Sequence, residues 1–408
     1  MLSDLVIWTG FVLSIIYLMV ISRKAMWVGL SVGALVLGLT CMDIVDIPGV
    51  VLDTITDPSI LFLALAVALI PILGGALEEG GLMDDLVKNL RIGKKAFLIV
   101  SPGLLALLPI PGGALLSAPL VNKSGAGVSP RRKAAINVWY RHAFVMVYPL
   151  GAILTCTKMA DINLYVGMLY VLPGSLLLLL LGYIFLVRKV EGRTEYKGSI
   201  DPKELFVSLG VFIIAPMLHF SLSSITSFLF DNEYTEFNMV LAVAVGLLVC
   251  FYAGGLRPRH LRPIAKKMKP WNFGLIIIGL FLFLNIFQAS DAPGVIASVE
   301  IPRVVFLVVI GAVLGFVTGR TTAPLAIMLP IYLVRYGGEG LEPITFSIMF
   351  LSIFMGYVIS PVHPCVSVSL EYFKASYKDL FKVMVVPTLL TIILLFIVAA
   401  LVFQFGLV

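Results

Sequence analysis

Long segments without a single charged residue dominate this chain and restrict what it can fold into. Each is as long, or nearly as long, as the about 20 apolar residues that a helix needs to cross a bilayer. Eight of them contain no Lys, Arg, Asp or Glu: 5–21, 25–42, 59–77, 162–187, 205–230, 237–256, 271–290 and 383–408. Two more, 134–157 and 343–370, also qualify, although the first contains Arg141. The chain is 60% hydrophobic and 13% charged, whereas about 25% of residues are charged in soluble proteins. The sequence therefore predicts an all-α polytopic membrane protein with about ten transmembrane helices.

Glycine and proline interrupt two further apolar stretches, at residues 96–121 and 304–334. The first contains LLPIPGGALLSAPLV and the second FVTGRTTAPLAIMLPIYLV. An unpaired backbone N–H or C=O costs several kcal/mol in lipid, so such a break is tolerated only inside protein or against a water-filled cavity. We therefore expect both stretches to be re-entrant hairpins that line a binding site.

The positions of the basic residues favour this hairpin topology. The chain has 29 Lys and Arg against 23 Asp and Glu. If both stretches return to the side they entered, nearly all basic residues fall in cytoplasmic loops, and the acidic segments 43–57 and 231–236 fall outside. If both stretches cross, the rule is inverted; if only the second crosses, the balance changes little. The basic excess thus indicates orientation in a membrane rather than nucleic-acid binding. Both termini are expected outside the cytoplasm, with 5–21 a retained helix rather than a signal peptide.

Landmark prolines recur at a nearly constant offset and predict two repeats. Four pairs are separated by 211 to 214 positions: Pro58 and Pro270, Pro119 and Pro330, Pro149 and Pro361, and Pro173 and Pro387. Each half then contains three spans, a hairpin and two more spans, so an odd number of crossings inverts the second half. The predicted domains are a first inverted repeat at 1–190, a cytoplasmic linker at 191–203 and a second repeat at 204–408. Inverted repeats are typical of secondary transporters, with the substrate bound where the repeats meet.

The span after each hairpin is also interrupted by proline. The predicted helix 134–157 contains Tyr148 to Gly151, and the predicted helix 343–370 contains Ser360 to Pro364. A single proline at the first break is compatible with a simple kink, whereas two prolines flanking polar Ser360 and His363 favour an unwound site element. We expect both to be broken helices.

The hairpin tips and the second break supply the candidate substrate-binding residues. Half-helices that end inside the membrane offer free N–H groups to anions and free C=O groups to cations. Arg320 is the only formal charge in its apolar stretch, and its planar fork suits a carboxylate; a structural bond to a carbonyl of another half-helix is the alternative. The neighbouring threonines either contact substrate or cation or bond their own helix. The candidates are Gly112, Gly113, Ala114, Ser117, Thr318, Arg320, Thr321, Thr322, Ser360 and His363.

Other polar residues in the predicted spans have either a structural role or a role in the binding site. Arg141 is expected to snorkel to the interface rather than reach the site, and His142 shares this assignment. His363 either binds substrate or protons or is a satisfied neutral side chain. Asn137 and Asn285 are expected to hydrogen-bond between helices. No span carries Asp or Glu far from its ends, which favours Na⁺ over a carboxylate proton relay as the coupling ion; no other cofactor is expected, and the metal ligands stay unassigned.

The layout and the motif Pro109-Ile-Pro-Gly-Gly-Ala-Leu-Leu-Ser-Ala-Pro119 together resemble the ion transporter superfamily. That superfamily includes sodium-coupled dicarboxylate and citrate carriers and gluconate permeases, and the motif is similar to that of a poorly characterised prokaryotic branch. The resemblance implies a homodimeric elevator carrier of organic anions, in which a scaffold supports a moving domain of hairpins and broken helices. The Ser-Asn-Thr signatures of the dicarboxylate carriers are absent from both tips, which read Pro-Gly-Gly-Ala and Thr-Gly-Arg-Thr-Thr.

These observations predict a secondary active transporter, not an enzyme, in a prokaryotic plasma membrane. Its cargo is expected to be a small organic anion, a carboxylate, carried together with a cation. A membrane-embedded enzyme and an anion channel are the alternatives. The first is disfavoured because the four histidines show no metal or triad spacing, and the second because a channel calls for a ring-forming pore motif. The expected partners are the anion, the lipid bilayer and a second copy of the chain, with no nucleic acid.

Overall fold

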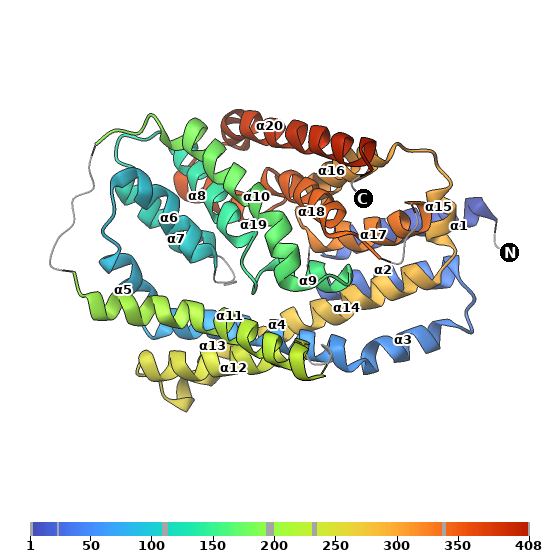
Figure 1. Ribbon diagram of the computed structural model, residues 1–408, viewed down its shortest axis with the longest axis horizontal. Helices are drawn as coiled ribbons and strands as arrows, with labels where there is room; N and C mark the ends of the chain where they lie inside the picture. The colour runs from blue at the N-terminus through green and yellow to red at the C-terminus, as the bar shows by residue number, and fades with distance from the viewer. Residues whose placement is uncertain are drawn as a thin grey trace.

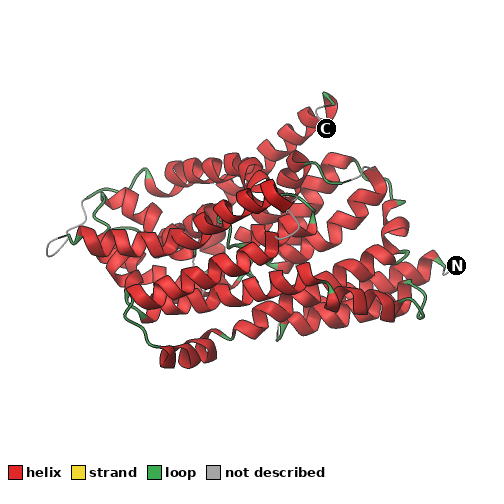
Figure 2. Ribbon diagram, turned by 60° about the horizontal axis from the view of Figure 1, so that its bottom comes forward, coloured by secondary structure: helices red, strands yellow, loops and turns green. Residues whose placement is uncertain are grey.

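The computed structural model describes residues 3–22, 24–107, 113–192, 200–230, 235–336 and 340–406, and these ranges contain helices and no strand (Figures 1 and 2). The first half comprises α1 (Asp4–Ser22), α2 (Met26–Cys41), α3 (Ile47–Thr56), α4 (Pro58–Glu79), α5 (Leu82–Asn89), α6 (Lys94–Ala106), α7 (Gly113–Ser124), α8 (Pro130–Val145), α9 (Ala152–Met159), α10 (Leu164–Gly182) and the π-helical turn η1 (Tyr183–Val187). The second half comprises α11 (Pro202–Phe230), α12 (Thr235–Ala253), η2 (Pro258–His260), α13 (Leu261–Met268), α14 (Pro270–Ala289), α15 (Ala292–Ala297), the π-helical turn η3 (Val305–Ile310), α16 (Gly311–Thr318), α17 (Thr322–Tyr336), α18 (Pro343–Val358), α19 (Pro364–Phe373) and α20 (Tyr377–Gln404).

Seven helices in the described ranges are long and apolar enough to cross a membrane. They are α1, α4, α10 with η1, α11, α12, α14 and α20. The remaining apolar helices are shorter: α2, α3, η3 with α16, α17 and α18. Local signals set several helix starts, as at α4, where Pro58 occupies the first turn and the Asp57 carboxylate accepts hydrogen bonds from the N–H groups of Ser59 and Ile60. The molecule is a polytopic helical membrane protein, as the sequence predicts.

The helices pack in two groups that meet along the length of the molecule (Figure 1). In the first group, α1 packs on α2, α14 packs on α2 and α4, and α12 packs on α4 and α11. In the second group, α8 packs on α6, α10 and α19, and α18 packs on α10, α16 and α20. α17 connects the groups because it contacts α14 and α15 as well as α16 and α18. The first group therefore holds the early helices of each half, and the second holds the hairpins, the broken helices and the last span of each half.

Both stretches that the sequence marks as hairpins contain two helices separated by a short connection. α6 and α7 pack against each other on either side of residues 107–112, of which 108–112 lie outside the described ranges. α16 ends at Thr318 and is followed by Gly319, whose φ of 62° lies in the left-handed region, and α17 starts at Thr322. A side chain at Gly319 would press on the backbone of Val362 and His363, so this turn needs glycine.

The two predicted breaks are present, each as a helix that stops and restarts. α8 ends at Val145 and α9 begins at Ala152, while α18 ends at Val358 and α19 begins at Pro364. The helices α3, α5, α13 and α15 were not expected: they fill segments that the charge pattern assigns to loops. Both α5 and α13 carry charges on one side and bury apolar residues on the other, a pattern too short to stand out beside the long apolar spans.

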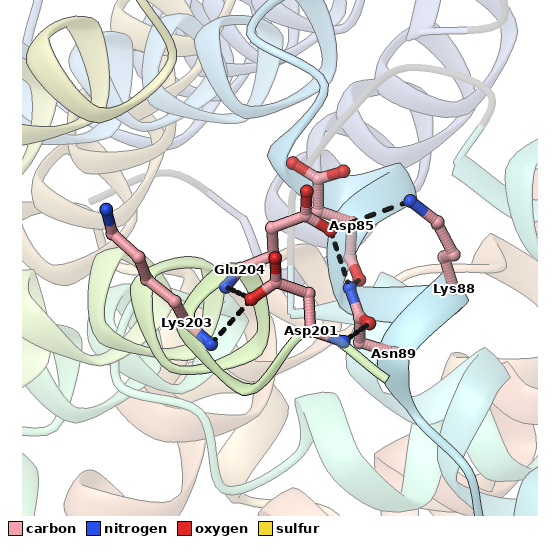
Figure 3. A network of polar contacts seen from close by, with 6 residues as sticks. All are labelled: Asp85, Lys88, Asn89, Asp201, Lys203 and Glu204. Carbon is pink, nitrogen blue, oxygen red and sulfur yellow. Dashed lines mark hydrogen bonds and ion pairs between the residues drawn. The ribbon is translucent and has the colours of Figure 1, made fainter. Parts of the chain in front are cut away.

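A polar network fixes the start of the second half against the first (Figure 3). Asn89, at the end of α5, is buried. Its side-chain nitrogen donates to the Glu204 carboxylate at 3.0 Å, and its side-chain oxygen Oδ1 accepts from the Asp201 N–H at 2.7 Å. Lys88 pairs with Glu204 at 3.6 Å on the surface. Burial and the Glu204 carboxylate raise the pKa of Asp85 beside them. The start of α11 is thus anchored to α5.

Replacing Asn89 with Ala is expected to destabilise the protein by about 1–3 kcal/mol, because the Asp201 N–H and the Glu204 carboxylate lose their hydrogen bonds to a buried side chain. Thermal unfolding in detergent measures the change. The matched control is Lys88→Ala, which removes an ion pair whose side chains are 66% and 38% exposed and which should change stability by less than about 1 kcal/mol. An equal effect of both substitutions would contradict this interpretation of the network.

Candidate functional site

A cavity of about 530 Å³ lies where the two groups of helices meet. The first group contributes residues of α2, α4 and α14, and the second contributes both hairpins and both broken helices. Its polar lining residues are Arg141, Thr155, Arg320, Thr321, Thr322, Tyr357, His363 and Cys365. The described lining contains two guanidinium groups and no carboxylate. The protein therefore leaves positive charge uncompensated at this site.

Four helices begin at the cavity. The first residues of α7, α9, α17 and α19 all line it: Gly113, Ala152, Thr322 and Pro364. Helix N-termini present free N–H groups and about half a positive charge each, so they attract anions. The ends of α6 and α8 line it too, at Ala106 and Val145, and offer carbonyl groups that attract cations. Backbone groups of both polarities thus converge here.

Arg320 faces the cavity from the turn between α16 and α17. Its guanidinium makes no hydrogen bond or ion pair with any described residue; only its backbone carbonyl accepts a bond, from Thr318. The alternative that it caps a carbonyl of another half-helix therefore has no support among the described residues. An arginine in a membrane-spanning region costs at least about 2.5 to 3.5 kcal/mol on insertion scales. Among the described residues, this guanidinium therefore has no hydrogen-bonding or charge partner.

Arg141 does not snorkel, so that expectation is wrong. Its side chain is only 6% exposed, and one of its terminal nitrogens donates to the Gly113 carbonyl at 2.9 Å and to the Ser117 hydroxyl at 3.1 Å. A Cβ at Gly113 would lie 2.9 Å from the other terminal nitrogen. The guanidinium turns inward because the start of α7 supplies acceptors that an isolated helix lacks, and Arg141 joins α8 to the first hairpin.

His142 also turns inward and bonds His363 across the two broken helices. Their Nε2 atoms are 2.9 Å apart, and His142 Nδ1 lies 2.5 Å from the Val138 carbonyl oxygen. The Tyr357 hydroxyl lies 3.3 Å from His142 Nε2. One turn earlier on α8, Asn137 donates to the Ala114 carbonyl at 3.2 Å and to the Ser369 hydroxyl at 2.9 Å. The α8 side chains at positions 137, 141 and 142 therefore hold together α7, α19 and the second break.

The predicted site residues fall into two sets. Gly113, Ala114, Arg320, Thr321, Thr322 and His363 line the cavity. Ser117 supports Arg141 from behind, Thr318 bonds the Leu314 carbonyl of its own helix at 2.7 Å, and Ser360 donates to the Phe316 carbonyl at 2.5 Å. Gly112 lies outside the described residues. The second set thus shapes the walls without facing the cavity.

The sequence did not indicate several residues that line the cavity. It did predict that two asparagines hydrogen-bond between helices. Phe273, Phe350, Phe354 and Tyr357 line the cavity, but aromatic residues in apolar spans give no sign of which face is buried. Helical spacing offers one signal: Phe350, Phe354 and Tyr357 repeat at four and three residues on α18. Asn137 and Asn285 hydrogen-bond between helices as expected, the latter to Thr54 at 2.9 Å.

The ring nitrogens of His142 and His363 and the Cys365 sulfur lie within 4.8 Å of one another. Such a trio fits a soft metal ion by ligand type. The two imidazoles, however, already bond each other, and Arg141 and Arg320 line the same cavity. Two guanidinium groups oppose a divalent cation, so we do not assign a metal here.

Comparisons with known proteins place the chain in a family. The chain is similar to the crystal structure of the Alcanivorax borkumensis YdaH transporter, with a TM-score of 0.61 and 13% sequence identity over 88% of each chain. At this identity the likeness shows a shared fold. No curated protein matches the chain. A family model described as "Protein of unknown function (DUF401)" matches residues 5–402. Because that match spans nearly the whole chain, the protein belongs to the DUF401 family.

Proposed function

We propose that the protein is a secondary active transporter of a small organic anion, a carboxylate, which binds in the cavity between the hairpin tips. The observation that carries this proposal is Arg320, a guanidinium that lines the cavity without a partner among the described residues. A planar guanidinium matches a carboxylate with two parallel hydrogen bonds. The cargo would supply the missing negative charge.

The remaining lining supports an organic cargo rather than a bare inorganic anion. Phe273, Phe350 and Phe354 and many aliphatic side chains form most of the wall. Pockets for organic molecules are mostly apolar, with a few polar groups that fix orientation. We place the carboxylate at Arg320 and Thr321 and the carbon skeleton against the phenylalanines.

The architecture supports alternating access. The two halves are proposed to be inverted repeats, and the second group of helices, with both hairpins and broken helices, is proposed to move against the first as an elevator. The homodimer and the cytoplasmic side of the linker remain predictions of the sequence. The carbonyl groups at the ends of α6 and α8 would suit a coupling cation, for which the sequence favours Na⁺.

A thermal-shift screen tests the proposal directly. Succinate, citrate, gluconate and benzoate are added separately to purified protein, with and without Na⁺. A ligand at 100 times its Kd stabilises by about 2.7 kcal/mol, so at least one anion should raise the melting temperature of the wild type and fail to do so in Arg320→Ala. A shift that survives the substitution would contradict the assignment of Arg320. A lack of any shift across the panel would contradict a carboxylate cargo of this kind.

A further inference from the structure

The His142–His363 pair is a second feature of the cavity that the proposed function does not yet use. It is buried, with side chains 2% and 3% exposed, and it connects α8 of the first half to the break before α19 in the second half. The two rings meet edge to face at a centroid distance of 4.8 Å. A hydrogen bond between two imidazoles requires one ring nitrogen to donate and the other to accept.

Its surroundings determine where the protons lie. A carbonyl oxygen only accepts, so His142 Nδ1 must carry a hydrogen and donate it to Val138. In neutral His142 the Nε2 atom is then an acceptor, and His363 Nε2 must donate to it. His363 Nδ1 is left without a hydrogen; it is buried and makes no hydrogen bond of normal geometry, while the Gly319 backbone lies beside the ring. The neutral pair therefore has a single open position for one additional proton, at His363 Nδ1.

The titratable and charged groups that face the pair come from four elements. These groups are Arg141 on α8, Tyr357 on α18, Cys365 on α19, and Arg320 in the turn between α16 and α17. No Asp or Glu belongs to the described cavity lining. The two guanidinium groups oppose a further positive charge, and a bound anion between them would offset that opposition. Proton binding and anion binding then favour each other, and by linkage each raises the affinity for the other by the same factor.

We propose that the His142–His363 pair binds the proton that travels with the anion, so that the protein is a proton–anion symporter rather than the Na⁺-coupled carrier that the sequence favours. This inference rests on the proposed function and names its coupling ion. The proton enters from water to His363 Nδ1 when the anion is bound and leaves to water when the anion is released; no other bond forms or breaks. The pair takes the role that a membrane carboxylate plays in other proton-driven carriers, which the described cavity lacks.

The proton site is tested first without any substrate. The chain contains four histidines, so full-length protein labelled with ¹⁵N-histidine gives few imidazole signals, which His142→Gln and His363→Gln assign. We expect the two cavity rings to share one hydrogen bond near neutral pH and to report a single, common protonation step on acidification. Two separate steps with unrelated midpoints, or a pair already charged near neutral pH, would overturn the proton site. The protonation step is measured on the wild-type protein, so the result holds even if a variant folds poorly.

The coupling is tested with ¹⁴C-labelled succinate, citrate, gluconate and benzoate, each in proteoliposomes without Na⁺. A monovalent anion such as gluconate or benzoate moves with one proton without net charge, so an inward proton gradient of about two pH units allows it up to about 100-fold accumulation, and we expect at least a ten-fold rise for one of these anions. His142→Gln and His363→Gln should lose this response, so that any exchange they retain no longer depends on the gradient. His260→Gln, outside the cavity, is the matched control and should behave as wild type.

The outcomes separate the two claims. Exchange that follows a Na⁺ gradient and ignores the proton gradient would overturn the symport while leaving the carrier in place. Accumulation driven by protons in His363→Gln would also overturn it. Absence of exchange for every anion in the wild type would defeat the proposed function and the coupling together, and the histidine spectra would still decide whether the pair binds a proton.

Discussion

Replacing Arg320 with Ala is expected to weaken binding of the transported anion by about 100-fold or more, because truncating one partner of a buried charge pair costs about 2–5 kcal/mol. The guanidinium has no partner among the described residues, so its removal should leave the fold intact while removing the counter-charge of the cargo. Binding is measured by thermal shift and by isothermal titration with the anion that stabilises the wild type. Arg320→Lys keeps the charge but loses the planar fork, and an intermediate loss of about ten-fold is expected.

Two controls make that result specific. Arg259→Ala removes an exposed arginine of η2 that does not line the cavity, and it should leave anion binding unchanged. The melting temperature of Arg320→Ala without ligand should equal or exceed that of the wild type, because an unpaired charge is removed. A large fall in that temperature would mean that Arg320 holds the structure together, which would contradict its role as a free counter-charge.

A second large effect is expected at the contact between α16 and α18. Gly315 and Gly356 each lie against the backbone of the other helix: a Cβ on Gly315 would overlap the Ile353 carbonyl oxygen, and a Cβ on Gly356 would overlap that of Ala312. Both obstacles are backbone, which cannot turn aside as a side chain can. Small residues allow membrane helices this close approach. Gly315→Ala and Gly356→Ala should each destabilise the protein by about 3 kcal/mol or more, the upper range for overpacking.

The measurement is the yield of folded protein after extraction and its melting temperature in detergent. The matched control is Gly210→Ala on α11, where an added Cβ meets nothing within 4 Å and where alanine favours the helix by about 1 kcal/mol. This control should fold as well as the wild type or better. If the two interface variants melt within about 1 °C of the control, the close approach of α16 and α18 would not contribute to stability.

The sequence predicts the helical class and the breaks in the helices, because the strongest constraint on a membrane chain is local. Uncharged length marks helices such as α4, α14 and α20, and Pro-Gly breaks mark where helices end inside the protein, as at Gly319 and before Pro364. The sequence does not predict how the helices pack against one another. The grouping of α4 with α12 and α14 depends on which faces of uniformly apolar helices meet, and such helices carry little periodicity to reveal that.

The candidate site was predicted in part for the same reason. Arg320 stands out because a charge in an apolar stretch needs an explanation, and the structure places it on the cavity. Arg141 was assigned to the interface because its distance from the helix end allows snorkelling; the acceptors at Gly113 and Ser117 come from a different hairpin and only the tertiary structure reveals them. The bond between His142 and His363 spans 221 residues, and no local pattern predicts a contact of that range.

Radiotracer counterflow measures whether the protein is a carrier that holds its cargo at Arg320. Proteoliposomes are loaded with the anion that stabilises the wild type in the thermal-shift screen, and uptake of the labelled anion is followed against its external concentration. We expect saturable uptake that unlabelled internal anion accelerates and that Arg320→Ala abolishes. Uptake that never saturates, or counterflow in Arg320→Ala equal to that of the wild type, would contradict a carrier that holds its cargo at Arg320.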